Sequence, residues 1–136
     1  MNISYEKLDN MSSKIISDKT TTNYTEVYCE NPDKWEFNAP HHFTVFAKTN
    51  KYEVPCKTLL TEINIQKGPI KENGINGVNN EDLLLIVMAR LMAFQESEYA
   101  CYENADALNH LEMALDSLRK RTNRRIKENK EGTSIV

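Results

Sequence analysis

A long apolar run in the second half of the chain is the feature that most constrains the fold. The residues from Leu83 to Ala89 are all apolar, and two acidic residues come directly before them. Acidic side chains are favourable in the first turn of a helix, and Asn79 or Asn80 can cap it. The pattern predicts a helix from about Glu81 to Gln95 that is apolar on nearly every face. In a small chain, a partner subunit must help to bury such a helix.

A second long helix is predicted beyond the polar break ESEY, from near Asn104 to about Lys127. Leucines recur along it at steps of three and four residues, which places them on one face of a helix. They are Leu108, Leu111, Leu115 and Leu118. The two helices together form a predicted antiparallel hairpin over residues 81–127, which is the clearest element of the chain.

Two arginines, Arg121 and Arg125, continue the leucine stripe with the same spacing. Residues 119–127 hold six basic side chains and no acidic one, although the net charge of the chain is −3. Basic residues near a helix C-terminus complement the helix dipole, and this explanation suits Lys120, Arg124 and Lys127. The two arginines of the stripe fall instead where an interface is expected, and a guanidinium there needs an anion or strong acceptors.

Phe94 is predicted at the opposite end of the hairpin from these arginines. Arg121 lies about 25 Å further along the second helix than Asn104, at 1.5 Å per residue. The aromatic ring and the arginines can therefore meet only if another subunit packs in reverse, as in an isologous dimer with two equivalent composite sites. Such a site suits a nucleotide. Its base can stack on the aromatic ring, its phosphates accept hydrogen bonds from the forked guanidinium, and its base edge or sugar forms hydrogen bonds with an amide. A phenylalanine at a helix end is more often a core residue, so both interpretations stay open at this point.

The first half of the chain carries strand patterns. YTEVY, HFTVF, KYEV and TEINIQ alternate apolar and polar residues, and a polar turn at 48–51 suggests a hairpin. We predict one α+β domain over residues 1–136, a small N-terminal antiparallel sheet followed by a two-helix antiparallel hairpin that oligomerises through the helices. Its predicted segments are an N-terminal arm or short helix at 1–23, the sheet at 24–67, a Gly/Asn-rich turn at 68–80, the hairpin at 81–127, and a loose tail at 128–136. The short helix is suggested by Tyr5, Leu8, Met11 and Ile15, which recur at helical spacing.

Composition places the chain among cytosolic proteins without a metal site. No apolar run approaches the length of a membrane span, and the N-terminus lacks the apolar region of a signal peptide. The cysteines Cys29, Cys56 and Cys101 follow no ligand spacing and are interpreted as reduced thiols. His41 and His42 are adjacent on a predicted strand and point to opposite faces, so they do not suit one metal. We therefore expect no metal and no cofactor.

The hairpin sequence resembles a known family. The order of parts is GPI, a Gly74-Ile75-Asn76-Gly77 turn, an acidic helix start, an apolar helix ending in Phe-Gln, a Glu-Asn-Ala step, and a helix ending in Arg-Thr and further arginines, with a final Glu131-Gly132-Thr133. This order resembles the hairpin domain shared by two phage anti-defence sponges, the anti-Thoeris protein of the first described type and the anti-CBASS protein. The match covers about half of the chain. PHHFTV, from Pro40 to Val45, looks like the sheet of the anti-Thoeris type, and residues 1–35 carry no part of the resemblance.

The resemblance implies a non-enzymatic sponge that works in the host bacterial cytoplasm. It would bind and withhold the cyclic ADP-ribose isomer (gcADPR type) that TIR enzymes make in Thoeris defence, as a homodimer or hexamer. Cyclic di- or trinucleotides would bind in a separate pocket that the resemblance does not locate. Matched residue by residue, the cyclic ADP-ribose pocket would contain Phe94, Asn104, Asp106, Arg121 and Arg125, with Asp106 the weakest candidate. No membrane, DNA or RNA partner is implied.

Two other functions remain open from the sequence. An enzyme that cleaves the cyclic nucleotide would need a general base or a metal, and Glu103 and Asp106 beside Asn104 are the available carboxylates. A small nucleic-acid-binding dimer would use the basic helix end, and its binding would weaken steeply with salt. The acidic net charge counts against this last function.

Overall fold

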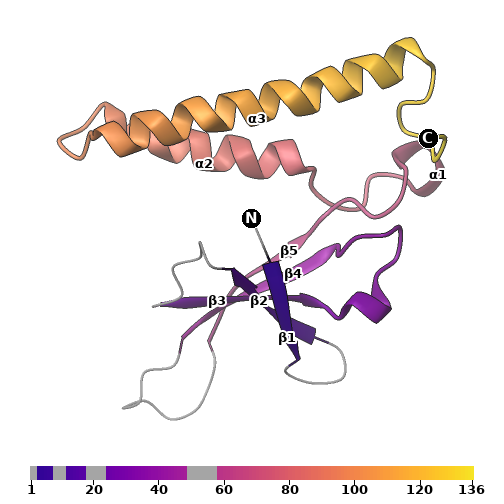
Figure 1. Cartoon of the computed structure of the whole chain (residues 1–136), viewed down its shortest axis with the longest axis horizontal. Helices are drawn as coiled ribbons and strands as arrows, with labels where there is room; N and C mark the ends of the chain where they lie inside the picture. The colour runs from indigo at the N-terminus through magenta and orange to yellow at the C-terminus, as the bar shows by residue number, and fades with distance from the viewer. Residues whose placement is uncertain (1–2, 8–11, 18–23, 49–57) are drawn as a thin grey trace. The chain divides into compact units, whose positions relative to one another are not determined.

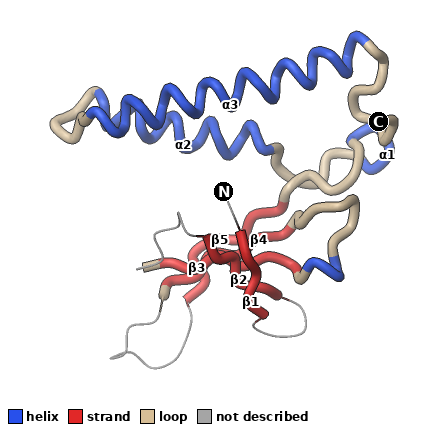
Figure 2. The backbone as a smooth tube through the Cα atoms, in the orientation of Figure 1, coloured by secondary structure: helices blue, strands red, loops and turns tan. Residues whose placement is uncertain are grey.

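The computed structural model describes residues 3–7, 12–17, 24–48 and 58–136. The chain divides into two compact units, Met1–Lys67 and Gly68–Val136. Strands build the first unit and helices the second, so the expected α+β class is confirmed (Figures 1 and 2). No helix in these residues is both long and apolar enough to cross a membrane.

In the residues that the structure describes, the first unit is an antiparallel meander of five strands. Its sheet has the order β1-β2-β3-β4-β5, so every strand pairs with the next one along the chain. The strands are β1 (Ile3–Lys7), β2 (Ser12–Ser17), β3 (Thr25–Glu30), β4 (His42–Ala47) and β5 (Thr58–Asn64). In the register, Val27 lies opposite Val45 and Phe43 lies opposite Ile63. The predicted strand KYEV at 51–54 lies outside the described residues.

The N-terminal arm or short helix predicted for residues 1–23 is wrong for the part that the structure describes. Ile3–Lys7 and Ser12–Ser17 are strands that pair antiparallel, with Tyr5 opposite Ile15. Leu8 and Met11, which completed the helical spacing, lie outside the described residues. β2 also pairs with β3, so a neighbouring strand stabilises the extended conformation of these residues.

The core of the sheet is small and partly polar. Tyr28 and Cys29 on β3 are both buried, and successive residues of a strand point to opposite faces, so both faces of this strand are covered. The Tyr28 ring packs edge-to-face on Phe46, with the centroids 5.5 Å apart. Ser13 and Asn31 are also buried, and the Ser13 hydroxyl donates a hydrogen bond to the Asn31 side-chain carbonyl. This bond satisfies polar groups that would otherwise destabilise the core.

The second unit contains the predicted helical hairpin. A short α1 (Ile70–Asn73) precedes α2 (Asn80–Gln95) and α3 (Tyr102–Lys127), and the two long helices run antiparallel (Figure 1). Asn79 is the N-cap of α2, and its backbone N–H donates to the Asp82 carboxylate at 2.8 Å in a capping box. With 26 residues against 16, α3 is the longer helix by roughly 15 Å at 1.5 Å per residue. It extends past the N-terminal end of α2 (Figure 2).

Within one chain, the two helices bury little of their apolar surface. Met88 on α2 and Leu115 on α3 are buried, and both line the same groove. Leu85, Ile86, Val87 and Met92 remain exposed, with Ile86 at 65%. A surface of this kind is what the sequence led us to expect for a helix that packs against a partner subunit, and oligomerisation through the helices stays a prediction.

Candidate functional site at the two ends of the helical hairpin

Phe94 lies in the last turn of α2 as part of a small aromatic cluster. The guanidinium carbon of Arg90, one turn earlier, lies 5.0 Å from the centroid of the Phe94 ring. Tyr99, in the turn between the long helices, packs edge-to-face on the same ring with the centroids 6.3 Å apart. Phe94 is half-buried and Tyr99 is exposed. The cluster holds an aromatic ring in a fixed orientation at the surface, and it is not part of the hairpin core.

Two further predicted site residues, Asn104 and Asp106, lie in the first turns of α3, at the same end of the hairpin. Asn104 is half-buried, whereas Asp106 is exposed. The Asp106 carboxylate lies 3.5 Å from His110 Nε2, at an i,i+4 spacing on the helix surface. Asp106 thus has a solvent-exposed partner within its own helix, and Asn104 is the better placed of the two to line a site with Phe94.

Arg121 and Arg125 lie at the other end of α3. Arg121 is exposed and Arg125 is half-buried. The Arg125 Nη2 atom lies within hydrogen-bond distance of the backbone carbonyls of Lys130, Thr133 and Ile135, at 3.0, 3.1 and 2.9 Å. Strong acceptors therefore do surround a guanidinium of the leucine stripe, and they belong to the C-terminal tail.

A single chain does not bring all the predicted site residues together. The first turns of α3 hold Asn104 and the last turns hold Arg121 and Arg125, and 17 residues of continuous helix correspond to about 25 Å. Phe94 and Asn104 share one end of the hairpin, and the two arginines share the other. The separation that the sequence predicts is therefore present.

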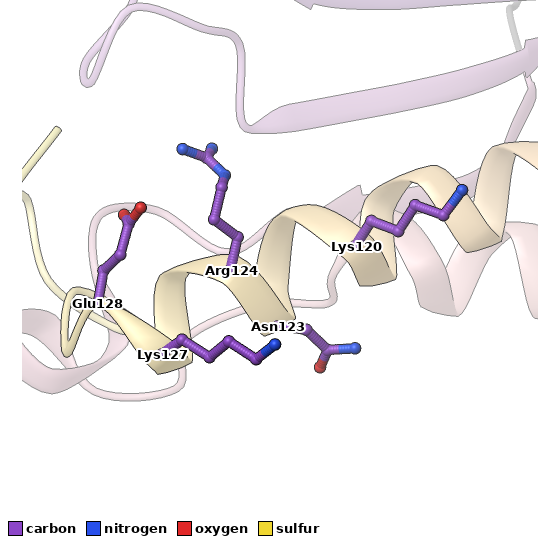
Figure 3. Close-up of a pocket in the computed structure, with 5 residues that line it drawn as sticks. All are labelled: Lys120, Asn123, Arg124, Lys127 and Glu128. Carbon is purple, nitrogen blue, oxygen red and sulfur yellow. The ribbon is translucent and has the colours of Figure 1, made fainter.

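A basic cavity of about 410 Å³ lies on the last turns of α3, next to these arginines. Five side chains line it, Lys120, Asn123, Arg124, Lys127 and Glu128 (Figure 3). Three cations and one carboxylate make it a surface for anionic groups. From the sequence, its cations were expected to complement the helix dipole, and Asn123 was not expected at a site. The available signal was the spacing i, i+3, i+4 and i+7 of Lys120, Asn123, Arg124 and Lys127, which places them on one face of the helix.

A second cavity, of about 390 Å³, lies along the groove between α2 and α3. It combines the buried Met88 and Leu115 with the exposed Leu85, and three charged residues of α3 border it, Glu112, Asp116 and Arg119. Apolar lining with a charged border is typical of a surface that another protein covers. This groove belongs to the same exposed apolar surface of α2.

Several other titratable residues, all in the first unit, pair with nearby groups or are buried. No group of three or more His, Cys, Asp or Glu side chains among the described residues is arranged to hold a metal ion. His41 Nε2 lies 2.7 Å from the Glu36 carbonyl, and His42 Nε2 lies 2.5 Å from the Glu62 carboxylate. Burial, and to a lesser extent the negative charge of Glu30, raise the pKa of the Cys29 thiol from 9.0 to about 11. That thiol is therefore a packing group at neutral pH.

The sequence is similar to a known protein family and to a phage protein. The profile of the family described as "Acb2/Tad1, hairpin domain" matches residues 58–122. A protein of Bacillus phage SBSphiJ7 named "Thoeris anti-defense 1" is 43% identical over 129 residues, which cover 82% of this chain and 91% of that protein. The chain belongs to the Thoeris anti-defense 1 family.

This assignment confirms the family that the hairpin sequence resembles. The matched hairpin segment runs from the start of β5 into the last third of α3, and it includes Phe94, Asn104, Asp106 and Arg121. Arg125 lies three residues beyond its end. The relative covers most of the chain, so the Thoeris anti-defense 1 family shares more than the hairpin with this protein.

Proposed function

We propose that this protein is a phage anti-defence protein that binds the cyclic ADP-ribose-type signal of Thoeris and withholds it without cleaving it. Membership of the Thoeris anti-defense 1 family supports the anti-Thoeris role. The protein would act in the host bacterial cytoplasm, where a TIR enzyme makes the signal. Sequestering the nucleotide would keep the Thoeris effector inactive.

The separation of Phe94 and Asn104 from Arg121 and Arg125 is the observation that carries the binding mechanism. The two groups lie about 25 Å apart along α3, so they act on one ligand only across two protomers. The exposed apolar surface of α2 supplies an interface for a second copy. If two hairpins pack in reverse about a two-fold axis, the turn end of one meets the arginine end of the other, which produces two equivalent sites.

Each side chain would have a distinct role in this composite site. Phe94 and Arg121 would flank the adenine ring, since aromatic rings and guanidinium planes both stack on bases. Asn104 would form hydrogen bonds with polar atoms of the ligand, and Arg125 would engage the pyrophosphate with a charge-assisted hydrogen bond. Asp106 is the weakest member, since its carboxylate is exposed and paired with His110.

We also propose that the dimers assemble further and that the protein binds a second class of ligand. Dimers would associate into hexamers, and cyclic di- or trinucleotides would bind at a separate site. If the sites are separate, saturation with a cyclic trinucleotide leaves the affinity for the cyclic ADP-ribose isomer unchanged. Competition between the two ligands would place both in one pocket and contradict this part.

Titration calorimetry with the cyclic ADP-ribose isomer made by a TIR synthase tests the central proposal. The protein–ligand complex is then denatured by heat, and the released nucleotide is identified by chromatography. Tight binding with slow release, as sequestration requires, and recovery of the intact nucleotide support a sponge. Recovery of a cleaved nucleotide would indicate an enzyme instead, and attention would move to Glu103 and Asp106.

A parallel titration with single-stranded oligonucleotides tests the nucleic-acid alternative. Binding that falls steeply with salt and does not depend on Phe94 would favour a protein that uses the basic cavity of α3 for phosphate backbones. The proposed sponge predicts no such binding at physiological salt. Failure of the protein to bind any cyclic ADP-ribose isomer would overturn the sponge mechanism.

A further inference from the structure

The C-terminal residues 128–136, predicted as a loose tail, fold back at the end of α3. We call residues 128–135 the C-terminal clasp. Their backbone carbonyls surround Nη2 of Arg125, with Lys130, Thr133 and Ile135 each contributing one oxygen within 3.1 Å. The prediction of a loose tail is therefore wrong for this segment, and the reason is a set of specific hydrogen bonds.

The clasp begins where α3 ends, and Asn129 favours this end of the helix. Asn129 adopts a left-handed conformation with φ of 57°, as asparagine does more readily than most residues. The Lys130 N–H donates to the Arg125 carbonyl at 2.8 Å, and the Asn129 N–H donates to the Ile126 carbonyl at 3.1 Å. These two bonds form a Schellman motif, which turns the chain sharply at the end of α3.

Helix α1 anchors the other side of the clasp. The Lys71 N–H donates to the Gly132 carbonyl at 2.9 Å. The Glu72 carboxylate accepts hydrogen bonds from the backbone N–H and the hydroxyl of Ser134, at 3.2 and 3.1 Å. Gly132 has a φ of 75°, and a Cβ atom there would lie 2.9 Å from Cγ of Lys71, so glycine is required. Lys71, the residue directly after the GPI motif, thus contacts the glycine of the Glu-Gly-Thr motif.

The clasp fixes the orientation of the Arg125 guanidinium. Nη2 carries two protons, and the three carbonyl oxygens are enough acceptors for both. Among the described residues, no hydrogen bond involves Nε or Nη1 of Arg125. The plane of the group is therefore held from one side, and two nitrogens remain able to donate to an anion. A long side chain ordered in this way loses its rotamer freedom on folding, so binding a ligand costs less.

We propose that the C-terminal clasp is a positioning device that presents Nη1 and Nε of Arg125 to a phosphate oxygen of the bound nucleotide. This inference rests on the proposed function, in which Arg125 engages the pyrophosphate. Glu72, Gly132 and Thr133 are the positioning residues, since they act on the ligand only through Arg125. The tail carbonyls orient the guanidinium, and they do not compete with the ligand for it.

A double-mutant cycle tests the clasp. The tail-release variant carries Glu72→Ala, Thr133→Gly and Ser134→Gly, which remove the Glu72–Ser134 part of the anchor on α1 and the side chains that order the turn. Calorimetry gives the Kd of the TIR-made cyclic ADP-ribose isomer for the wild type, the tail-release variant, Arg125→Ala, and the combined variant. We expect the tail-release variant to bind about three- to tenfold more weakly, as expected when one long side chain must be ordered on binding. In the Arg125→Ala background, releasing the tail should have no further effect.

Matched controls separate positioning from folding. Val136→Ala alters an exposed terminal residue and should bind like the wild type. Glu72→Gln keeps an acceptor oxygen for Ser134 and should restore most of the affinity that Glu72→Ala loses. If the tail-release variant lacks the helical circular dichroism of the wild type, the comparison of Glu72→Ala with Glu72→Gln tests the clasp without it.

The possible outcomes distinguish this inference from the proposed function. If the wild type binds and Arg125→Ala weakens binding, but releasing the tail changes nothing or tightens binding, the clasp is not a positioning device. Equal losses from tail release with and without Arg125 would mean a purely structural role and would also overturn the inference. If the wild type does not bind the nucleotide, the proposed function fails and the clasp inference fails with it.

Discussion

Gln95 and Cys101 are joined by two hydrogen bonds across the turn between the long helices. The Gln95 side-chain amide donates to the Cys101 carbonyl at 3.0 Å, and the Cys101 backbone N–H donates to the Gln95 side-chain oxygen at 3.0 Å. One amide thus links the end of α2 to the residue directly before α3. The neighbouring residue Phe94 and the first turns of α3, with Asn104, take their relative position from this link.

We predict that Gln95→Ala destabilises the hairpin by about 1–3 kcal/mol, since two hydrogen bonds are lost and the backbone groups of Cys101 lose their partner. Urea denaturation followed by circular dichroism at 222 nm measures this effect, because α2 and α3 dominate the helical signal. Gln95→Glu keeps an acceptor oxygen for the Cys101 N–H but loses the amide donor. Its free energy of unfolding should equal that of Gln95→Ala or lie below it. An unchanged midpoint in both variants would show that the turn does not depend on this amide.

Phe94→Ala should weaken binding of the cyclic ADP-ribose isomer by about 1–3 kcal/mol, the usual contribution of an aromatic ring stacked on a base. Phe94→Trp keeps a stacking surface and should retain most of the affinity. Tyr102→Ala is the matched control, because Tyr102 is a nearby aromatic residue that is 78% exposed. Equal effects of Phe94→Ala and the control on affinity would remove Phe94 from the site.

Arg121→Ala and Phe94→Ala chains should complement each other in a mixed dimer. If each site combines Phe94 of one protomer with Arg121 of its partner, a mixed dimer has one intact site and one doubly altered site. Random pairing at equal expression should therefore restore about a quarter of the wild-type sites. Calorimetric stoichiometry of the co-expressed proteins measures this fraction. No recovery of high-affinity sites would contradict a composite site that takes Phe94 from one protomer and Arg121 from its partner.

The stability of the first unit should fall as the pH rises from about 9 to about 11, because of Cys29. Burial, followed by the charge of Glu30, raises the pKa of this thiol to about 11, so the folded chain keeps a proton that the unfolded chain has lost. The unfolded state then binds fewer protons, and the free energy of unfolding decreases with pH in this window. Below pH 9 the full contribution is present.

Denaturation at pH 8 and pH 10.5, followed by the fluorescence of the single tryptophan, Trp35, measures this decrease. Trp35 reports on the same region, since its indole N–H donates to the Glu30 carbonyl at 2.9 Å. Cys29→Ala should show a smaller loss of stability between the two pH values. If both proteins lose stability equally, ionisation of Cys29 is not responsible.

Strong local patterns in the sequence predicted the hairpin correctly. The apolar run and the acidic first turn placed α2 within one residue of its observed start, and the leucine stripe placed α3 within two. The apolar spacing in the N-terminal residues gave a wrong prediction. Tyr5 and Ile15 fit a helix by spacing, yet they pair across β1 and β2, because strand pairing depends on residues elsewhere in the chain.

The sequence by itself determined the helical hairpin, the separation of Phe94 from the arginines, and the family of the protein. Helical periodicity and motif order are properties of neighbouring residues, so they can be predicted without the fold. Only the tertiary structure decided the role of the C-terminal residues. Glu72 and Ser134 are 62 positions apart, and their contact depends on how α1 and the end of α3 pack. That packing surrounds the Arg125 guanidinium with carbonyl oxygens, an arrangement that no local pattern in the sequence specifies.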